Sequence, residues 1–188
     1  MEVILASRSP RRLMLLQSAG LAVEVRPSHI DETPLAGESV AEIVQRLCKG
    51  KALACESTTP VIAADTLVAI NGEPLGQAAN LGEAKKMLLK LSGQTHHVYT
   101  GVCVRLGNTF LTDLVRTEVR FRVITGQEID IYLAHNEVLD KAGSYAIQGG
   151  AASFIESIDG QLDNVIGLPV RQTMNMLTEI TFPEHKGP

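Results

Sequence analysis

The sequence of 188 residues is poor in aromatic side chains: it has no tryptophan, three tyrosines and four phenylalanines. Proteins that bind single-stranded nucleic acid commonly stack bases on aromatic rings, so this scarcity argues against that function. The sequence also lacks an excess of positive charge, because 17 Lys and Arg stand against 21 Asp and Glu, a formal net charge of −4. A protein whose main partner is a polyphosphate backbone needs a basic surface. Any phosphate that binds here must therefore meet a local cluster of positive groups.

Cysteine is scarce too, and its spacing excludes common cysteine sites. Cys48 and Cys55 would lie ~10 Å apart on a helix, too far for a disulfide bond, and Cys103 leaves the number odd. CxxC spacing and HxxxH pairs are both missing, which argues against a structural zinc site. The opening MEVILASRSPRR has an acidic second residue and a short apolar run, unlike a signal peptide or membrane anchor. We expect reduced thiols in a soluble, cytoplasmic protein.

The overall composition is that of a globular protein. Hydrophobic residues make up 45% of the chain and charged residues 20%, so a chain of this length can bury roughly two-thirds of its unfolded surface. This excludes intrinsic disorder and a disulfide-dependent miniprotein. We expect residues 1–188 to form a single domain, either one compact body or two closely packed lobes.

Short apolar runs alternate with segments of helical periodicity. Asn71-Gly72 is a strong hairpin signal, and Ser39 and Thr125 each precede a glutamate by three residues, the spacing of a helix capping box. Interleaved strands and helices with hairpins predict an α/β fold with a mixed sheet. The expected strands are 3–6, 22–27, 98–106, 109–123 and 151–158, and the expected helices are 10–20, 39–54, 81–91, 125–136 and 169–179.

The loop after the first predicted strand is a candidate phosphate site. It contains two hydroxyls and three arginines, and Arg11 and Arg12 would occupy the first turn of a helix, where the helix dipole disfavours cations. A negative ligand would compensate them, with Ser7 and the free backbone N–H groups as further donors. The alternative is two solvated arginines. The sequence has neither GxxxxGK[ST] nor GxGxxG, so a P-loop kinase or a Rossmann enzyme is not supported.

Asp65 interrupts the apolar run 61–70. A carboxylate there costs stability unless it is paired or metal-bound, and the end of a strand at an active-site mouth would explain it. The alternative is a surface break between two short strands. Glu32 follows Asp31 in a polar turn and could supply an oxygen ligand to Mg²⁺ or Mn²⁺, although such a pair is usually just solvated.

Two further polar residues could serve a ligand or the fold. Lys51 lies near the end of a predicted helix, where a cation is favoured anyway. Gln148 lies among glycines that permit close backbone approach to a ligand, and its amide offers both a donor and an acceptor, but a plain loop would have the same composition.

Taken together, six motifs resemble the Maf family of nucleoside triphosphate pyrophosphatases over nearly the whole chain. The resemblance implies an elongated α/β fold with a mixed sheet and two lobes around a cleft, related to inosine triphosphate pyrophosphatases and often homodimeric. It implies a nucleoside triphosphate as substrate, with no nucleic acid or membrane partner. The motifs are LASRSPRR, IDET, AADTLV, LSGQTHHVYTGV, DKAGSYAIQG and NVIGLPV.

Three positions assign a subgroup within that resemblance. Arg11, Thr66 and Gln148 match the pyrimidine-directed subgroup, whereas the subgroup that acts on 7-methyl-GTP carries Trp, Gln and Glu there. The methylated guanine is cationic and favours an aromatic face and a carboxylate, while a neutral uracil or thymine suits Arg and an amide. The resemblance thus implies a hydrolase, a dTTP/UTP pyrophosphatase that cleans the nucleotide pool.

The resemblance also implies roles for individual residues. Asp65 matches the proton acceptor that activates water, and Glu32, with Asp65, matches the ligands of a divalent cation, Mg²⁺ or Mn²⁺. Ser7, Arg12 and Lys51 match positions that bind phosphate.

One departure keeps other functions open. Where family members commonly have Gly-Lys-Pro, this chain has Gly76-Gln77-Ala78, which loses a cation that would contact phosphate. Weak turnover would fit a nucleotide-binding regulator of cell division and septum formation. Another alternative is a house-cleaning enzyme for noncanonical purine triphosphates.

Overall fold

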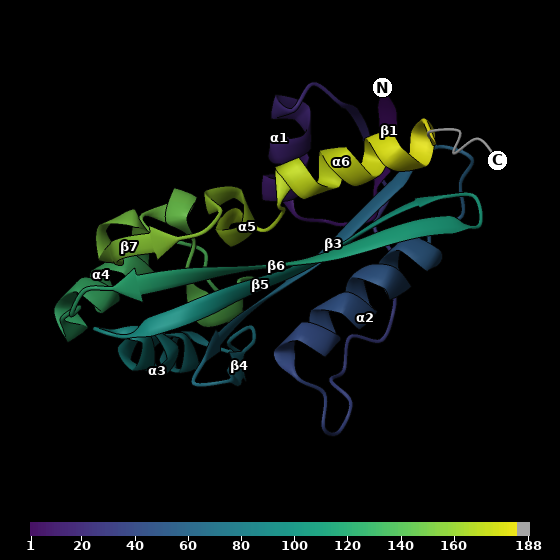
Figure 1. Cartoon of the computed structure of the whole chain (residues 1–188). Helices are drawn as coiled ribbons and strands as arrows, with labels where there is room; N and C mark the ends of the chain where they lie inside the picture. Colours follow the sequence, from purple (N-terminus) through teal and green to yellow (C-terminus); the bar gives the residue numbers. More distant parts are fainter. Residues whose placement is uncertain (184–188) are drawn as a thin grey trace. The chain divides into compact units, whose positions relative to one another are not determined.

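The structure is a computed structural model that describes residues 1–183 (Figure 1). Within them, seven strands form one mixed sheet in the order β2-β1-β3-β5-β6-β7, with β4 paired to β3. The elements are β1 (Glu2–Leu5), α1 (Pro10–Ser18), β2 (Ala22–Val25), α2 (Val40–Leu53), β3 (Val61–Ile70), β4 (Glu73–Leu75), α3 (Leu81–Leu91), β5 (Thr95–Leu106), β6 (Thr109–Phe121), α4 (Gly126–His135), the 3₁₀ turns η1 (Ala142–Ser144), η2 (Ile147–Gly149) and η3 (Ala151–Phe154), β7 (Ile155–Asp159), α5 (Leu162–Ile166) and α6 (Val170–Thr181).

The chain divides into two compact units. The first unit comprises Met1–Asp65, Thr100–Val115 and Gly167–Pro188, and the second comprises Thr66–Tyr99 and Arg116–Ile166. The chain passes from one unit to the other within β3, β5 and β6 and again between α5 and α6. The expected cleft between two lobes stays a prediction.

The first unit has helices on both faces of its strands (Figure 1). β1 pairs in parallel with β2 and β3. Because side chains alternate along a strand, Val3 and Leu5 pack in a core that includes residues of α1 and α6, whereas Ile4 and Ala6 pack in a core with residues of α2. β1 is thus buried on both faces, which explains its nearly continuous apolar sequence.

Helix α2 lies unusually close to β5, and Gly101 makes this possible. A Cβ atom on Gly101 would lie 2.4 Å from the carbonyl oxygen of Val44 on α2. Any larger residue would push the helix off the strand. This contact accounts for the glycine in the TGV segment of the fifth strand.

The second unit is built around one apolar cluster of β-strand, α3 and α4 side chains, including Leu88, Phe121, Ile129 and Phe154. Helix α4 begins at the capping box predicted from the sequence: Thr125 Oγ1 accepts from the Glu128 N–H, and the Glu128 carboxylate accepts from the Thr125 N–H. Three short 3₁₀ turns follow α4 and carry the Gly-rich segment.

The mixed α/β prediction is confirmed, and most of its elements are present. Two details are wrong. The run Val61–Ile70 is one continuous strand with Asp65 buried in its middle, not a strand that ends there. Residues 151–154 form η3, so that strand begins only at Ile155.

Two further observations bear on the composition. None of the helices within residues 1–183 is both long and apolar enough to cross a membrane. All three cysteines are free and buried in one small core, and burial raises the pKa of Cys48 to about 12 and that of Cys103 to about 11. Both thiols are therefore protonated and poorly nucleophilic at neutral pH.

Candidate active site

The loop between β1 and α1 forms a compact donor cluster. Ser9 caps α1, and its hydroxyl oxygen accepts from the Arg12 N–H. The hydroxyl oxygen of Ser7, itself buried, accepts from the Ser9 N–H at 3.2 Å and from Arg12 Nη1 at 3.0 Å. Arg12 Nε donates to the carbonyl oxygen of Gly167 at 2.8 Å. Arg12 is thus fixed at both ends of its guanidinium and is not a freely solvated side chain.

Two carboxylates partly offset the burial of the Arg12 charge. The first turn of α1 holds no acidic residue, so the compensation comes from other segments. Burial lowers the pKa of Arg12 below its usual value, while the charges of Asp65 and Glu32 act in the opposite direction. Two carboxylates thus place negative charge near Arg12, but burial has the larger effect on its pKa.

Neighbouring Arg11 lies on the same turn. Its Nε is buried and makes no hydrogen bond to any residue of the described part of the chain. A buried donor without a partner is costly, so Arg11 is not simply a solvated arginine.

Lys51 joins two carboxylates. Its ammonium donates to Asp65 Oδ1 at 2.6 Å and forms an ion pair with Glu32 Oε1 at 3.0 Å. Lys51 is only 8% exposed and Asp65 only 7%, while the side chain of Glu32 is 55% exposed. The interpretation of Lys51 as an ordinary cation at a helix end is therefore insufficient, because a lysine with that role would be solvated.

The three groups come from three different segments. Asp65 is placed by β3, Lys51 by the last turn of α2, and Glu32 by the loop that precedes α2. Removing two charges from water costs several kcal/mol per ion in real proteins, and mutual attraction offsets this only with good geometry. A buried ion pair at a strand centre is thus weak evidence for a stabilising role, and buried charges of this kind often mark functional sites.

The two carboxylates also bear on cation binding. Within residues 1–183, the structure has no cluster of three or more His, Cys, Asp or Glu side chains that could hold a metal. Mg²⁺, however, is commonly bound by one or two carboxylates together with substrate phosphates and water. Glu32 and Asp65 already converge on one cationic group, the Lys51 ammonium, so their oxygens fit this kind of shared site.

The other predicted site residues belong to the second unit. Thr66 directly follows Asp65 on β3, and Gln148 lies exposed in η2. Gln77, which replaces the expected lysine, is exposed and donates from Nε2 to the carbonyl oxygen of Asp140 at 3.1 Å. A common site for these residues and the carboxylates stays a prediction.

The segment that carries Gln148 is firmly held within its unit. The Ala146 N–H donates to the Tyr132 hydroxyl at 3.1 Å, and the Gly149 N–H donates to the Ala146 carbonyl at 3.0 Å. Ser144 in the preceding turn has a φ of 59°, a left-handed conformation that costs energy for a residue with a Cβ. An exposed amide on such a constrained segment can present its donor and acceptor in a fixed direction.

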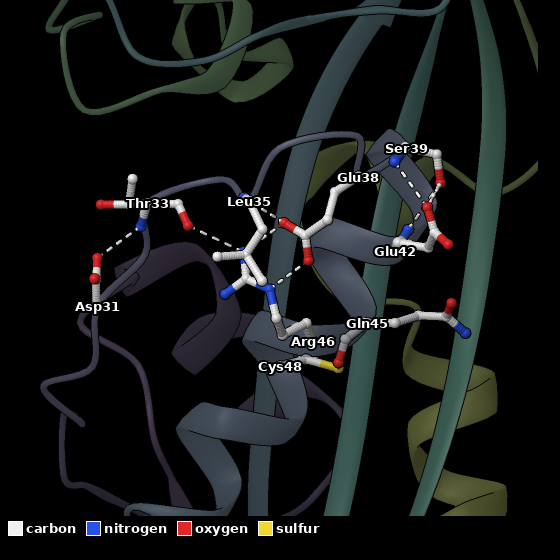
Figure 2. Close-up of polar contacts among 9 residues, drawn as sticks. All are labelled: Asp31, Thr33, Leu35, Glu38, Ser39, Glu42, Gln45, Arg46 and Cys48. Atoms are coloured by element: carbon white, nitrogen blue, oxygen red, sulfur yellow. Dashed lines mark hydrogen bonds and ion pairs between the residues drawn. The ribbon is translucent and has the colours of Figure 1, made fainter.

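Sequence reasoning missed two contributors to the site. The first is the Gly167 carbonyl that orients Arg12, which sits 155 residues away along the chain. The second is the pair of Arg46 and Glu38, which binds the loop that carries Glu32 (Figure 2). A backbone carbonyl leaves no signal in a sequence, and the acidic and basic residues had the spacing of ordinary surface charge.

Comparison with known proteins assigns the chain to a family. The family model described as "Maf-like protein" matches residues 2–180. The chain belongs to the Maf family. The resemblance inferred from the six motifs is therefore confirmed, and it covers both units of this Maf chain.

Curated relatives match over nearly their full lengths. A dTTP/UTP pyrophosphatase of Anaeromyxobacter dehalogenans is 44% identical over 185 residues, covering 96% of this chain and 95% of that protein. Proteins of the same name from Symbiobacterium thermophilum and Bacillus pumilus are 42% and 46% identical, covering 99% and 94% of this chain and 97% and 95% of those proteins. Among solved structures, the Ham1 protein of Staphylococcus aureus matches with a TM-score of 0.45 and 16% identity, over 64% of this chain and 72% of that one. That likeness is too weak to bear on the fold.

Proposed function

We propose that this Maf-family chain hydrolyses dTTP and UTP to the nucleoside monophosphate and pyrophosphate. The observation that carries the proposal is the buried Lys51–Asp65 pair with Glu32 on the same ammonium. A carboxylate and a cation held together at the middle of an apolar strand supply a proton acceptor and a phosphate ligand at one place. The names of the curated relatives support the choice of substrates.

Asp65 is the proton acceptor in this proposal. It takes a proton from water as the water oxygen attacks the α-phosphorus, the bond from that phosphorus to the bridging oxygen breaks, and pyrophosphate leaves with the electron pair. Ser7, Arg12 and Lys51 bind the phosphates. The fixed guanidinium of Arg12 costs little reorganisation when charge develops, which is the usual source of electrostatic catalysis.

A divalent cation fits the two carboxylates. Glu32 and Asp65 would hold Mg²⁺ or Mn²⁺ together with substrate phosphate oxygens, since both side chains already converge on Lys51. Such an ion supplies positive charge that neutralises the phosphate oxygens. The protein's own contribution is to bring the two carboxylates to one point.

Base selection falls to Arg11, Thr66 and Gln148 in this proposal. The guanidinium of Arg11 carries five N–H donors, and a pyrimidine carbonyl accepts from donors of this kind. The exposed Gln148 amide, on its constrained turn, can both donate and accept. We place this chemistry in the cytoplasm, where the three free thiols would stay reduced.

The decisive experiment measures pyrophosphate release by the full chain from dTTP, UTP, CTP, 7-methyl-GTP and ITP, each with and without Mg²⁺ or Mn²⁺. We expect the largest kcat/KM for dTTP and UTP and a requirement for the cation. Preference for 7-methyl-GTP or ITP would contradict the substrate assignment. Binding of dTTP without turnover would instead favour the nucleotide-binding regulator.

A companion variant tests the missing lysine. Gln77→Lys should raise kcat/KM for dTTP, by ten-fold or more if the new contact forms mainly in the transition state. We do not expect Lys85 to replace that charge, because its ammonium pairs with Asp130 at 2.6 Å. An unchanged kcat/KM together with brisk wild-type turnover would show that the departure is compensated.

A further inference from the structure

The loop between β2 and α2 carries Glu32, and Arg46 binds it to α2 (Figure 2). Arg46 donates from Nε to Glu38 Oε1 and from Nη2 to Glu38 Oε2 at 2.7 Å, a two-point ion pair. The same Nη2 donates to the carbonyl oxygen of Thr33 at 3.1 Å. One guanidinium therefore holds the loop at its end and also at the residue that directly follows Glu32.

Short-range hydrogen bonds make the loop stiff between these points. The Thr33 N–H donates to Asp31 Oδ1 at 2.9 Å, and the Leu35 N–H donates to Glu38 Oε2 at 2.8 Å (Figure 2). The first of these hydrogen bonds, from Thr33 to Asp31, forms an Asx turn, which fixes a bend in the backbone. A displacement of Arg46 would thus release the loop as one piece.

Apolar packing adds a contact on the other side of Glu32. Ile30 rests over Gly50 of α2, where an added Cβ would lie 3.1 Å from Ile30 Cδ1. Gly50, near the end of this helix, therefore gives room for the loop. Glu32 lies between an apolar contact at residue 30 and a carbonyl contact at residue 33.

The same helix carries the partner that Glu32 reaches. Arg46 and Lys51 both belong to α2, and Glu32 Oε1 lies 3.0 Å from Lys51 Nζ. Glu32 itself is 55% exposed, and an exposed carboxylate has many rotamers to choose from. Its approach to the buried Lys51–Asp65 pair depends on where the loop backbone is held.

We infer that Arg46, paired with Glu38, is a positioning residue that holds the Glu32 loop against α2 so that Glu32 stays with Lys51 and Asp65. Two-point guanidinium–carboxylate pairs are geometrically specific, and lysine cannot reproduce them. The interaction also lowers the pKa of Glu38 and raises that of Arg46. The catalytic side of the inference rests on the proposed function, in which Glu32 contributes to cation binding.

The test compares Arg46→Gln with a matched control, Arg26→Gln, in the full chain. Arg26 also makes two hydrogen bonds to one glutamate, Glu24, and one to a backbone carbonyl, that of Glu56. It stands at the start of the same loop, but neither of these partners lies within residues 30–38. Two readouts are taken: amide hydrogen exchange at Thr33 and Leu35, and kcat/KM for dTTP as a function of Mg²⁺ or Mn²⁺ concentration.

We expect faster exchange at both amides in Arg46→Gln, a kcat/KM lower by ten- to a hundred-fold, and a higher cation concentration for half-maximal rate, as for outer-shell partners of metal ligands. Arg26→Gln should match the wild type in all three. Arg46→Lys should recover little of the exchange protection or of kcat/KM, because a positive charge alone does not hold the Thr33 carbonyl. Glu38→Gln serves as the second variant and should change all three measurements in the same direction as Arg46→Gln.

The inference requires both effects together. Unchanged exchange in Arg46→Gln, or loosened exchange with kcat/KM and cation requirement equal to those of Arg26→Gln, overturns it. If the wild-type chain releases no pyrophosphate from any pyrimidine triphosphate, the proposed function fails by itself. The exchange experiment then decides alone whether Arg46 holds the loop.

Discussion

Each unit contains a buried pair of titratable side chains, and these two pairs have opposite chemistry. In the first unit, Lys51 and Asp65 are joined at 2.6 Å, a pair of ionisable groups of opposite charge type. In the second, His96 Nε2 and the Tyr145 hydroxyl are hydrogen-bonded at 2.8 Å, and His96 is fully buried. Burial lowers the pKa of His96 to about 4 and raises that of Tyr145, so both groups are neutral at pH 7.

The surroundings of the second pair explain its role. The His96 ring meets Phe121 edge-on at 4.8 Å and Tyr145 at 5.5 Å between ring centroids. Edge-to-face rings and a hydrogen bond between neutral groups stabilise a core without burying a charge, although His96 Nδ1 is buried without a hydrogen-bond partner within residues 1–183. The Lys51–Asp65 pair has a large desolvation cost and no such compensation by packing. The comparison therefore assigns the neutral pair to the fold and the charged pair to chemistry.

The largest expected effect follows from removing the carboxylate of the charged pair. Asp65→Asn keeps the shape of the side chain but removes the proton acceptor, so kcat/KM for dTTP should fall by roughly 10²–10⁴-fold. The far-ultraviolet circular dichroism and cooperative unfolding should be retained. Near wild-type turnover in a well-folded Asp65→Asn variant would mean that Asp65 is not the proton acceptor.

The neutral pair should make stability depend on pH. The unfolded His96 has a pKa near its ordinary 6.5 and the folded one a pKa of about 4, so the folded state resists protonation. The stabilisation is complete above pH 6.5 and is lost as the pH falls from 6.5 to 4. The loss amounts to about 3 kcal/mol over this range.

This dependence can be measured by urea unfolding at pH 7, 5.5 and 4.5 in the wild type and in His96→Gln. The variant cannot titrate at this position, so its free energy of unfolding should fall less steeply between pH 6.5 and 4. The difference between the two slopes isolates His96 from the carboxylates that titrate in both chains. Equal slopes would show that His96 is not buried as a neutral ring.

Local signals accounted for much of the fold. The capping boxes at Ser39 and Thr125 act within three residues, so both helix starts could be predicted from adjacent letters. The burial of Asp65 could not be predicted in this way, because it depends on an ion pair with Lys51, which belongs to helix α2 and lies 14 residues earlier in the chain. An isolated carboxylate in an apolar run looked like the end of a strand, and only the lysine allows the strand to continue.

The candidate site also has parts that the sequence predicts and parts that it does not. The family resemblance named Ser7, Arg12, Lys51, Asp65 and Glu32, and all five belong to the first unit, where Ser7 contacts Arg12 and where Lys51 pairs with both carboxylates. The contacts that hold them there involve the Gly167 carbonyl and the Arg46–Glu38 pair. These partners are set by tertiary packing, so no pattern of residue types marks them. The roles of Thr66 and Gln148, like a homodimer, stay predictions.

The smallest expected change in stability sharpens the comparison most. If the charged pair is kept for chemistry, then replacing both members by apolar residues of similar size, Lys51→Met with Asp65→Leu, should abolish activity and leave stability unchanged or higher by about 1–2 kcal/mol. Asp65→Leu alone should cost about 3 kcal/mol, because it leaves the buried Lys51 ammonium with only the exposed Glu32 as partner. Urea unfolding at pH 7 of the wild type, the single variant and the double variant supplies all three values. A double variant that is as unstable as the single one would show that the ion pair supports the fold, as the His96–Tyr145 pair does, and the distinction between the two units would be lost.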